Sequence, residues 1–289
     1  MLVVLWAIMI MAVAVVGFVE YAKRTVERDA ADAKEFEARF LAESGLVLAG
    51  HPLVKRGDPV LRQEMGTARG FEVTATTEGA RIAIHLIAVS PVIQEAVRDL
   101  FFRWGLDLEN ASMVVDSLAD WVDADDDERV RGAERDFYAQ RGRPRYPANV
   151  GFRDLEEVRL VRGMELVTEL NPDWKEAFTL YGDGTLDVNE ASAEMVEMIC
   201  QVDFEAAERL VQRRRGPDEI DHTWDDVIYT DMREVREMLG LGFRDFVRIQ
   251  SRMTLAHPVR RVESRGWAGD RSKRLVAILG GGHRELFER

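Results

Sequence analysis

The chain opens on nineteen residues without a charged side chain, whereas the rest is rich in Asp, Glu, Lys and Arg. An apolar run of this length is about what a helix needs to span a bilayer, at roughly 1.5 Å per residue. The run continues without a proline into a stretch whose apolar residues recur at helical spacing, namely Val26, Ala30, Ala33, Phe36, Phe40 and Val47. The pattern predicts one helix from Met1 to about Leu48, transmembrane over 1–19, amphipathic over 20–50 and ended by His51-Pro52.

The pattern beyond the helix changes period twice. Alternating residues at 71–75 and 82–86, about a turn at Thr77-Glu78-Gly79, predict a β-hairpin. Helical spacing then dominates, and strand-like segments return near the C-terminus. The expected helices cover 91–105, 109–122, 153–163, 189–200, 203–216 and 231–240, and the expected strands cover 245–256, 258–268 and 273–280.

Together these segments predict an α+β fold in which a long N-terminal helix lies on an antiparallel sheet. The strand segments are too few for two independent sheets, so the helical region is interpreted as an insertion. We expect a β domain made of residues 51–89 and 244–289, and an inserted all-α domain over 90–243. Asn189 and Asp203 are expected to cap helices at their N-termini, and Gly163, Gly216 and Gly240 at their C-termini.

The composition of the chain excludes several classes of function. The chain has 39 basic and 52 acidic residues, a net charge of −13, which disfavours bulk binding to phosphate backbones. Cys200 is the only cysteine, so no internal disulfide can form, and a small buried residue on a helix is expected there. The five histidines are scattered and no HExxH, GxxxxGK[ST] or GxSxG motif occurs. We therefore expect no enzyme, with neither catalytic nor cofactor-binding residues.

The segment DWVDADDDERVRGAERDFY carries the candidate chemistry. Asp123, Asp125, Asp127 and Glu134 stand at positions 1, 3, 5 and 12, where a calcium loop of the EF-hand type places its ligands. Crowded carboxylates repel one another unless a cation neutralises them. The spacing predicts that these four residues bind calcium. The alternative is a solvated acidic loop that caps a helix.

The loop departs from an ordinary EF-hand. Position 6 is Glu128 instead of glycine, and Gly132 is expected to supply flexibility four residues later. Asp120 and Asp136 are candidate helix caps or additional ligands. A second group of oxygens, Asp183, Asp187 and Asn189, is interpreted as a turn and a helix cap, with a second metal as the alternative.

Several segments resemble one known family. They are VVLW in the anchor, LADWVDADDDERVRGAERDFY, YPANVGFRDLEEVRLVRGM and LDVNEASAEMVEMI. They are similar to the minor pseudopilin K of bacterial type II secretion systems. In this resemblance Asp123, Asp125 and Glu134 match the family's acidic motif, whereas Asp127 rests on the spacing alone.

The resemblance implies a pilin-like fold interrupted by a large calcium-binding α-domain. It implies a single-pass protein of the inner membrane with its body in the periplasm, at the tip of a short pseudopilus above other minor pseudopilins. Its partners would be those pseudopilins, with secreted substrates or the outer-membrane channel as further contacts. Its role would be to start assembly and support protein export across the outer membrane.

Two features differ from the family pattern. Family precursors carry a short basic leader that a prepilin peptidase removes, and none precedes Met1. We expect either a late start or a chain written without its leader. Many pilins also carry Glu at the fifth mature position, whereas the first carboxylate here is Glu20. A subunit without that carboxylate suits the last position of a filament.

A competing function comes from residues 186–216, which look like a helix-hairpin-helix element. Such elements grip DNA backbones, and with a membrane anchor this one would indicate a DNA-uptake receptor. The hairpin reads CQVDF, with no glycine to let backbone amides approach a phosphate. Arg213, Arg214 and Arg215 are basic, but acidic residues surround them in the sequence. The acidic balance therefore favours a protein that binds no nucleic acid.

Overall fold

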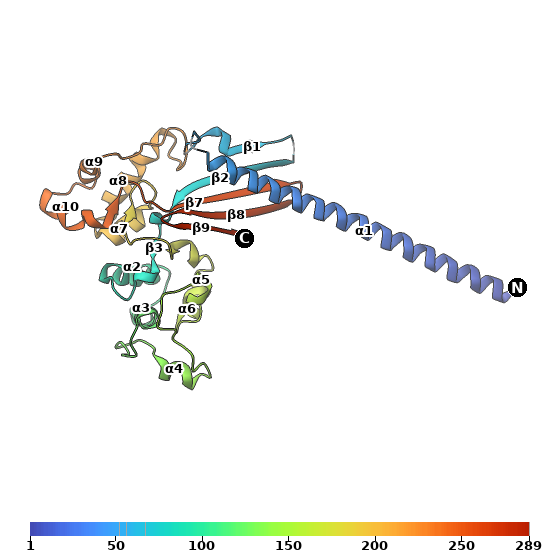
Figure 1. Ribbon diagram of the computed structural model, residues 1–289, viewed down its shortest axis with the longest axis horizontal. Coiled ribbons are helices and arrows are strands. Elements are labelled where there is room, and N and C mark those ends of the chain that lie inside the picture. The colour runs from blue at the N-terminus through green and yellow to red at the C-terminus, as the bar shows by residue number, and fades with distance from the viewer. Residues whose placement is uncertain (52, 56, 67, 289) are drawn as a thin grey trace. The chain divides into compact units, whose positions relative to one another are not determined.

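The computed structural model describes residues 1–289 apart from 52, 56, 67 and 289. These residues form two compact units. The first contains Met1–Ala75, Val262–Ala277 and Glu285–Arg289, and the second contains Thr76–Arg261 and Ile278–Arg284. The first unit holds the long helix and most of the main sheet, and the second holds the shorter helices (Figure 1).

Helix α1 spans Leu2–Ala49, which confirms the single long N-terminal helix. Its first half is exposed and apolar, and the helix is long and apolar enough to cross a membrane. The proline expected to end it, Pro52, lies outside the described residues.

The C-terminal half of α1 buries a different face from the one expected. Small residues and one leucine are covered, with Ala38 and Ala42 at 0 % exposure and Leu41 at 7 %. The predicted apolar stripe points outward instead, because Phe36 is 72 % and Phe40 60 % exposed. Small side chains let a helix approach a sheet closely, so they take the inner face.

A five-stranded sheet in the order β1-β2-β7-β8-β9 supports α1 (Figure 1). The first two strands are antiparallel, with Arg62 opposite Glu72. A two-residue turn joins β7 to β8, which requires an antiparallel pair. The strands are β1 Arg62–Glu64, β2 Arg69–Thr77, β7 Arg260–Ala268, β8 Arg271–Gly280 and β9 His283–Glu288.

Gly266 in β7 marks where the helix and the sheet meet most closely. A β-carbon there would stand 2.0 Å from the carbonyl oxygen of Ala38 and 2.5 Å from the amide nitrogen of Ala42. Both neighbours are backbone atoms of α1, which cannot move aside as a flexible side chain can. Glycine is therefore required at this position for the observed packing.

The predicted hairpin at 71–86 is wrong in its second strand. Residues 78–80 form a 3-10 turn, and only Ile82–Ala83 (β3) remain extended. This short strand pairs in parallel with Phe178–Thr179 (β4), not with β2. Ile82, Ile84 and Ile87 are almost fully buried in the core of the second unit, so burial in that core overrides the local turn signal.

The strand predicted at 245–256 is also largely wrong. Phe243–Ile249 form helix α10, with Phe246 turned into the core, and only Met253–Thr254 (β6) are extended. Strand β6 pairs in parallel with Leu186–Asp187 (β5), so the inserted unit carries two small sheets and is not purely α-helical. Strand β9, by contrast, lies in a tail where no strand was expected.

The helices of the second unit surround one apolar core that includes Phe101, Trp121, Phe178 and Leu210. All six helices expected between 91 and 240 are present, although the one at 153–163 is reduced to a single turn. Helices α4 and α6 were not expected. The helices are α2 Pro91–Arg103, α3 Leu108–Val122, α4 Arg135–Gln140, α5 Leu155–Val158, α6 Met164–Leu170, α7 Ala193–Cys200, α8 Phe204–Arg214 and α9 Met232–Met238.

Two expected helix caps are wrong. Gly163 does not end α5, whose C-cap is Arg159, but stands in the N-cap position of α6. Asn189 does not cap α7; its side chain is buried and donates to the carbonyl oxygens of Tyr229 and Leu255. The N-cap is Ser192, whose hydroxyl accepts a hydrogen bond from the Met195 amide. Asp203 does occupy the N-cap position of α8, without a side-chain cap bond.

Candidate metal centre

The acidic loop joins two helices of the second unit. Helix α3 ends at Val122, residues 123–134 form the loop, and α4 begins at Arg135 with Glu134 in its N-cap position. Asp120 lies in the last turn of α3 and is fully buried. One buried carboxylate therefore lies just before the loop and another at its end.

Asp120 organises the loop through hydrogen bonds. Its Oδ2 accepts from the backbone amide of Ala133 at 2.9 Å, and its Oδ1 accepts from the Arg129 guanidinium at 2.6 Å. The same Arg129 Nη1 also contacts Asp123 Oδ2. One guanidinium group thus lies between two carboxylates, where it supplies positive charge.

Gly132 is necessary for this arrangement. A β-carbon on Gly132 would stand 1.7 Å from Asp120 Oδ2, which is inside any allowed contact. The backbone dihedrals of Gly132 are not in the left-handed region. The flexibility expected of Gly132 is therefore not its role. Gly132 is needed because it has no side chain, which lets the loop close over Asp120.

Glu134 is a buried carboxylate whose pKa is raised. The residue is 4 % exposed, and both of its carboxylate oxygens are buried without a hydrogen-bond partner. Burial, reinforced by the negative charges of Asp120 and Asp123, raises the pKa of Glu134 to about 7. Asp123 Oδ1 is likewise buried and unpartnered, and burial raises the pKa of Asp123 in spite of Arg129.

The structure brings together a different set from the one predicted. Asp123 and Glu134 lie at the buried end of the loop with Asp120, whereas Asp125 and Asp127 are exposed. Asp125 Oδ1 accepts the backbone amide of Asp127 at 3.0 Å, which folds the loop locally. Asp120 stands three residues before Asp123, the C-cap residue of α3, and this spacing is the signal in the sequence that could have placed the two carboxylates together.

The donor chemistry fits a divalent cation. Three buried carboxylate oxygens without partners are an uncommon and costly arrangement, since buried acceptors are normally hydrogen-bonded. Calcium prefers hard oxygen ligands of this kind. As the side chains stand, no three metal-binding groups among the described residues converge tightly enough to hold an ion. Calcium at this loop therefore stays a prediction.

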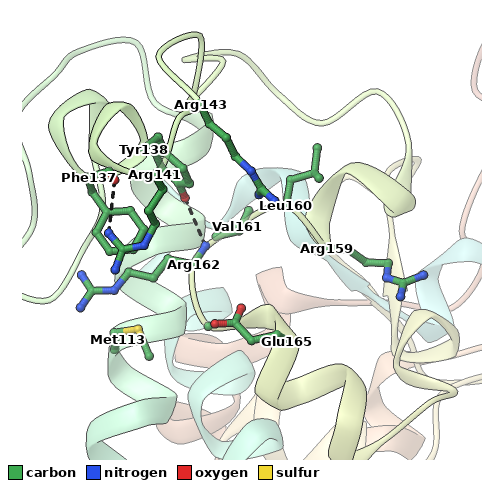
Figure 2. A pocket seen from close by; sticks show the side chains of 11 residues that line it. Met113, Phe137, Tyr138, Arg141, Arg143, Arg159, Leu160, Val161, Arg162 and Glu165 are labelled. Atoms are coloured by element: carbon green, nitrogen blue, oxygen red, sulfur yellow. Dashed lines mark hydrogen bonds between the residues drawn. The ribbon is translucent and has the colours of Figure 1, made fainter.

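Aromatic side chains pack next to the acidic loop. Trp121 is fully buried, and its ring lies 5.5 Å from Tyr138 and 5.0 Å from Tyr146. Tyr138 Oη accepts the backbone amide of Arg162 at 3.1 Å (Figure 2), and Arg162 donates to the Gly132 carbonyl at 2.7 Å. These contacts attach the loop to the segment before α6.

The second group of oxygens, at 183–189, is satisfied by the protein itself. Asp187 is buried, and its oxygens accept from the Thr77 hydroxyl and from the backbone amides of Asn189 and His257, each at 3.0 Å. Asp183 caps a turn through Thr185. Asp183 therefore lies in a turn as expected, whereas Asp187 acts as the centre of a hydrogen-bond network that the sequence did not predict.

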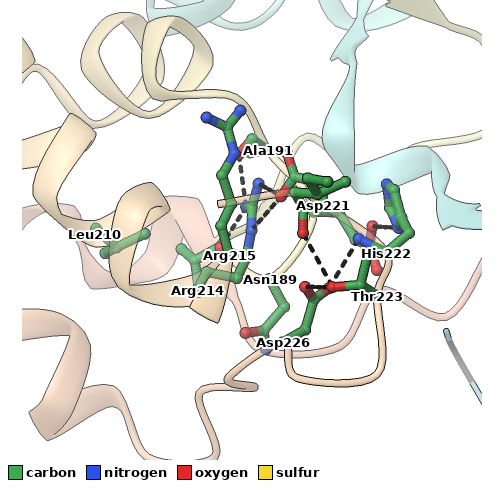
Figure 3. Close-up of polar contacts among 12 residues, drawn as sticks. Asn189, Ala191, Leu210, Arg214, Arg215, Asp221, His222, Thr223 and Asp226 are labelled. Atoms are coloured by element: carbon green, nitrogen blue, oxygen red, sulfur yellow. Dashed lines mark hydrogen bonds and ion pairs between the residues drawn. The ribbon is translucent and has the colours of Figure 1, made fainter. Parts of the chain in front are cut away.

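Two of the three basic residues of the helix-hairpin-helix candidate, Arg214 and Arg215, are engaged internally (Figure 3), whereas Arg213 is exposed. Arg214 is 1 % exposed; it contacts Asp221 at 2.9 Å and donates to the carbonyl of Ala191 at 2.7 Å. Arg215 contacts the other oxygen of Asp221 at 3.0 Å. Burial opposes the ionisation of Asp221, but the two arginines lower its pKa. These guanidinium groups face a carboxylate, so the contacts do not favour the DNA-binding alternative.

The fold defines the class of protein. A long N-terminal helix on an antiparallel sheet, interrupted by a helical unit, is a pilin-like architecture. The chain matches a chain in the crystal structure of the GspK-GspI-GspJ complex from the enterotoxigenic Escherichia coli type 2 secretion system. The TM-score is 0.61 at 17 % identity, over 93 % of this chain and 98 % of the other, which confirms the expected α+β fold.

Sequence comparisons then show similarity to the members of one family. Residues 74–172, which include the acidic loop, match the family model of type II secretion system (T2SS), protein K. The chain is 37 % identical over 65 residues to a putative type II secretion system protein K of Escherichia coli K12, and 33 % over 75 residues to the protein K of Dickeya chrysanthemi. The aligned part spans about a fifth of the length of these curated relatives. The resemblance to protein K stated above is thereby confirmed.

Proposed function

We propose that this chain is a minor pseudopilin at the tip of a type II secretion pseudopilus, where it helps start assembly and supports protein export across the outer membrane. The match of residues 74–172 to the protein K family is the observation that carries the proposal. The pilin-like fold, which is matched over 93 % of the chain, also supports it. A component of this kind acts by assembling with other subunits, not by catalysis.

The outer face of α1 supports assembly with other pilin-like subunits. Three large apolar side chains of α1 are 60–77 % exposed, although side chains of this kind are normally buried; they are Phe36, Phe40 and Val47. Pilin-type subunits pack their first helices together, and this stripe would meet a neighbouring helix. The matched crystal structure is a complex of GspK with GspI and GspJ, so we propose other minor pseudopilins as the partners.

Two features suit the last position of a filament. The second unit, Thr76–Arg261 with Ile278–Arg284, is large and would obstruct repeated stacking above it. Residues 1–19 hold no carboxylate, so this stretch of α1 offers none to a subunit above. We place the apolar half of α1 in the inner membrane and the rest of the chain in the periplasm.

We propose calcium as the cation of the acidic loop, held by Asp123 and Glu134 together with Asp120. When bound, the ion would neutralise the buried carboxylates. Asp120 would continue to hold the loop through the Ala133 amide. The Arg129 guanidinium carries the same sign of charge as the ion, so it would have to give up its contact with Asp123. The exposed Asp125 and Asp127 would contribute less than the spacing predicts.

Assembly can be tested by co-purification from detergent with the equivalent pseudopilins of the same organism. The wild-type chain should elute with them, and Phe36→Asp with Phe40→Asp should remove the association. Phe102→Asp is the matched control, because Phe102 is 56 % exposed on α2 and outside the stripe. Elution of the wild-type chain alone, or equal loss with Phe102→Asp, would contradict the proposal.

The tip position has its own test. Deleting residues 91–240 should impair pseudopilus initiation and leave exported proteins in the periplasm of the source organism. Unchanged assembly, secretion and tip occupancy after that deletion would contradict the tip assignment.

A further inference from the structure

A pocket of about 470 Å³ opens beside the acidic loop, within the second unit (Figure 2). Met113 of α3, residues of α4 and the turn after it, and the segment 159–165 line it. Its volume lies within the range of about 300–1,000 Å³ that is usual for ligand sites. It is separate from Asp123 and Glu134, neither of which lines it.

Arginine dominates the lining. Arg141, Arg143, Arg159 and Arg162 all border the pocket, and Glu165 is the one carboxylate among its lining residues. This concentration of positive charge stands out in a chain with a net charge of −13. Figure 2 shows Arg143 reaching from the turn after α4 toward Leu160.

Most of these guanidinium groups have no acidic partner. Within the part of the chain that the structure describes, Arg141, Arg143 and Arg162 form no ion pair, whereas Arg159 meets Glu156 at 3.5 Å. Other arginines of the same unit, such as Arg129 and Arg214, are bound to aspartates. Positive charge is therefore left available at the pocket.

An aromatic ring orients two of the arginines. The guanidinium carbon of Arg141 lies 3.6 Å from the centre of the Phe137 ring, and that of Arg162 lies 4.6 Å from it. Such stacking holds the guanidinium planes while leaving N–H groups free to donate. Leu160 and Met113 add apolar surface to the same pocket.

We propose that this pocket binds an acidic peptide segment of a partner protein. Planar guanidinium groups donate pairs of hydrogen bonds to carboxylates, and the Phe137, Leu160 and Met113 surface would receive an apolar side chain of the same segment. The overall negative charge of the chain opposes a nucleic acid, whose phosphates are spread along a whole backbone. The inference does not depend on the tip assignment.

The test is fluorescence anisotropy with the full chain in detergent and a labelled, end-blocked peptide of Asp, Glu and Leu. The wild-type protein should bind it, and replacing Asp and Glu by Asn and Gln in the peptide should weaken binding about tenfold or more. Arg141→Gln with Arg143→Gln should do the same. The Arg141→Lys, Arg143→Lys double variant should lose less affinity for the peptide, because lysine keeps the positive charge but not the paired hydrogen-bond donors.

Arg209→Gln is the control for charge alone, since Arg209 is exposed on α8 away from the pocket. It should leave the affinity unchanged, and unaltered circular dichroism should verify the fold of each variant. Equal binding of the amide peptide, or an equal loss with Arg209→Gln, would overturn the proposal. Displacement by equimolar inorganic phosphate would indicate a simple anion site, and tighter binding of a nonspecific DNA duplex would indicate a nucleic-acid site; either would also overturn it.

Discussion

Gly132 lies against Asp120 so closely that a β-carbon on the glycine would come within 1.7 Å of the carboxylate. Asp120 is fully buried and bonds the Ala133 amide and Arg129. The two residues thus decide whether the acidic loop can close. Neither belongs to the 1-3-5-12 spacing that first indicates a calcium loop.

Replacing Gly132 by alanine should therefore destabilise the second unit. The added methyl group must displace Asp120 or the loop backbone, and overpacking of this kind costs about 1–3 kcal/mol. Chemical denaturation followed by tryptophan fluorescence would measure the loss, because Trp121 is buried beneath the loop. Gly151→Ala is the matched control, since a β-carbon there meets nothing within 4 Å. Equal stability of the Gly132 variant and the wild type would show that the loop does not close on Asp120.

Removing the Asp221 carboxylate should also be costly. Asp221→Ala leaves the buried Arg214 guanidinium without its counter-charge, and we expect a loss of about 2 kcal/mol. Denaturation midpoints would report it. Asp245→Ala should change little, because Asp245 forms a solvent-exposed pair with Arg248 at 3.9 Å. A neutral outcome for Asp221→Ala would mean that the loop after α8 is not held as the structure shows.

Cys200 should be chemically silent in the folded protein. Burial raises the pKa of its thiol to about 12, and the side chain is fully buried on α7. Only the thiolate reacts with alkylating agents, so labelling should stay slow from pH 7 to pH 9, a range in which an ordinary thiol becomes markedly more reactive. Mass spectrometry after iodoacetamide treatment would follow it, with denatured protein as the control. Rapid labelling of native protein would refute the buried placement.

The sequence predicts most of the helices and strands, but not all of the strands and side chains with which they pair or pack. Helical periodicity finds α1 and six of the eight helices between 91 and 240, because each has an apolar face or caps that can be recognised locally. It fails where long-range pairing decides the outcome. Ile82 alternates like a strand residue of a hairpin, yet β3 pairs with Phe178, almost a hundred residues away. The segment 243–249 is helical because Phe246 packs into the core, which no local pattern indicates.

For the candidate site, which stays a prediction, the sequence indicates the loop but not the positions of its side chains. Carboxylate spacing indicates the loop, and Glu134 proves to be its most perturbed group. Spacing cannot show that Asp125 folds back onto the Asp127 amide, nor that Arg129 enters between Asp120 and Asp123. Those depend on the path of the loop in three dimensions. On α1, periodicity finds an apolar stripe but cannot tell that the small residues Ala38 and Ala42 would take the buried face.

Glu134→Gln should separate the two roles of that side chain. In chelator the variant should be more stable than the wild type, because it removes a buried negative charge beside Asp120 and Asp123. In calcium it should be less stable than the wild type, because an amide has lost the charge that holds the ion. Thermal melts in both conditions would reveal this change of sign. A variant that is destabilised in both would argue for a purely structural carboxylate.

The most direct measurement is a thermal melt of the full chain in detergent, with calcium and with chelator. A ligand that binds only the folded state adds about 2.7 kcal/mol at 100 times its dissociation constant, so calcium should raise the Tm clearly. Asp123→Ala with Glu134→Ala should abolish the difference, whereas Asp125→Asn with Asp127→Asn should retain most of it. An identical Tm for the wild-type chain in calcium and in chelator would contradict the cation-stabilised loop.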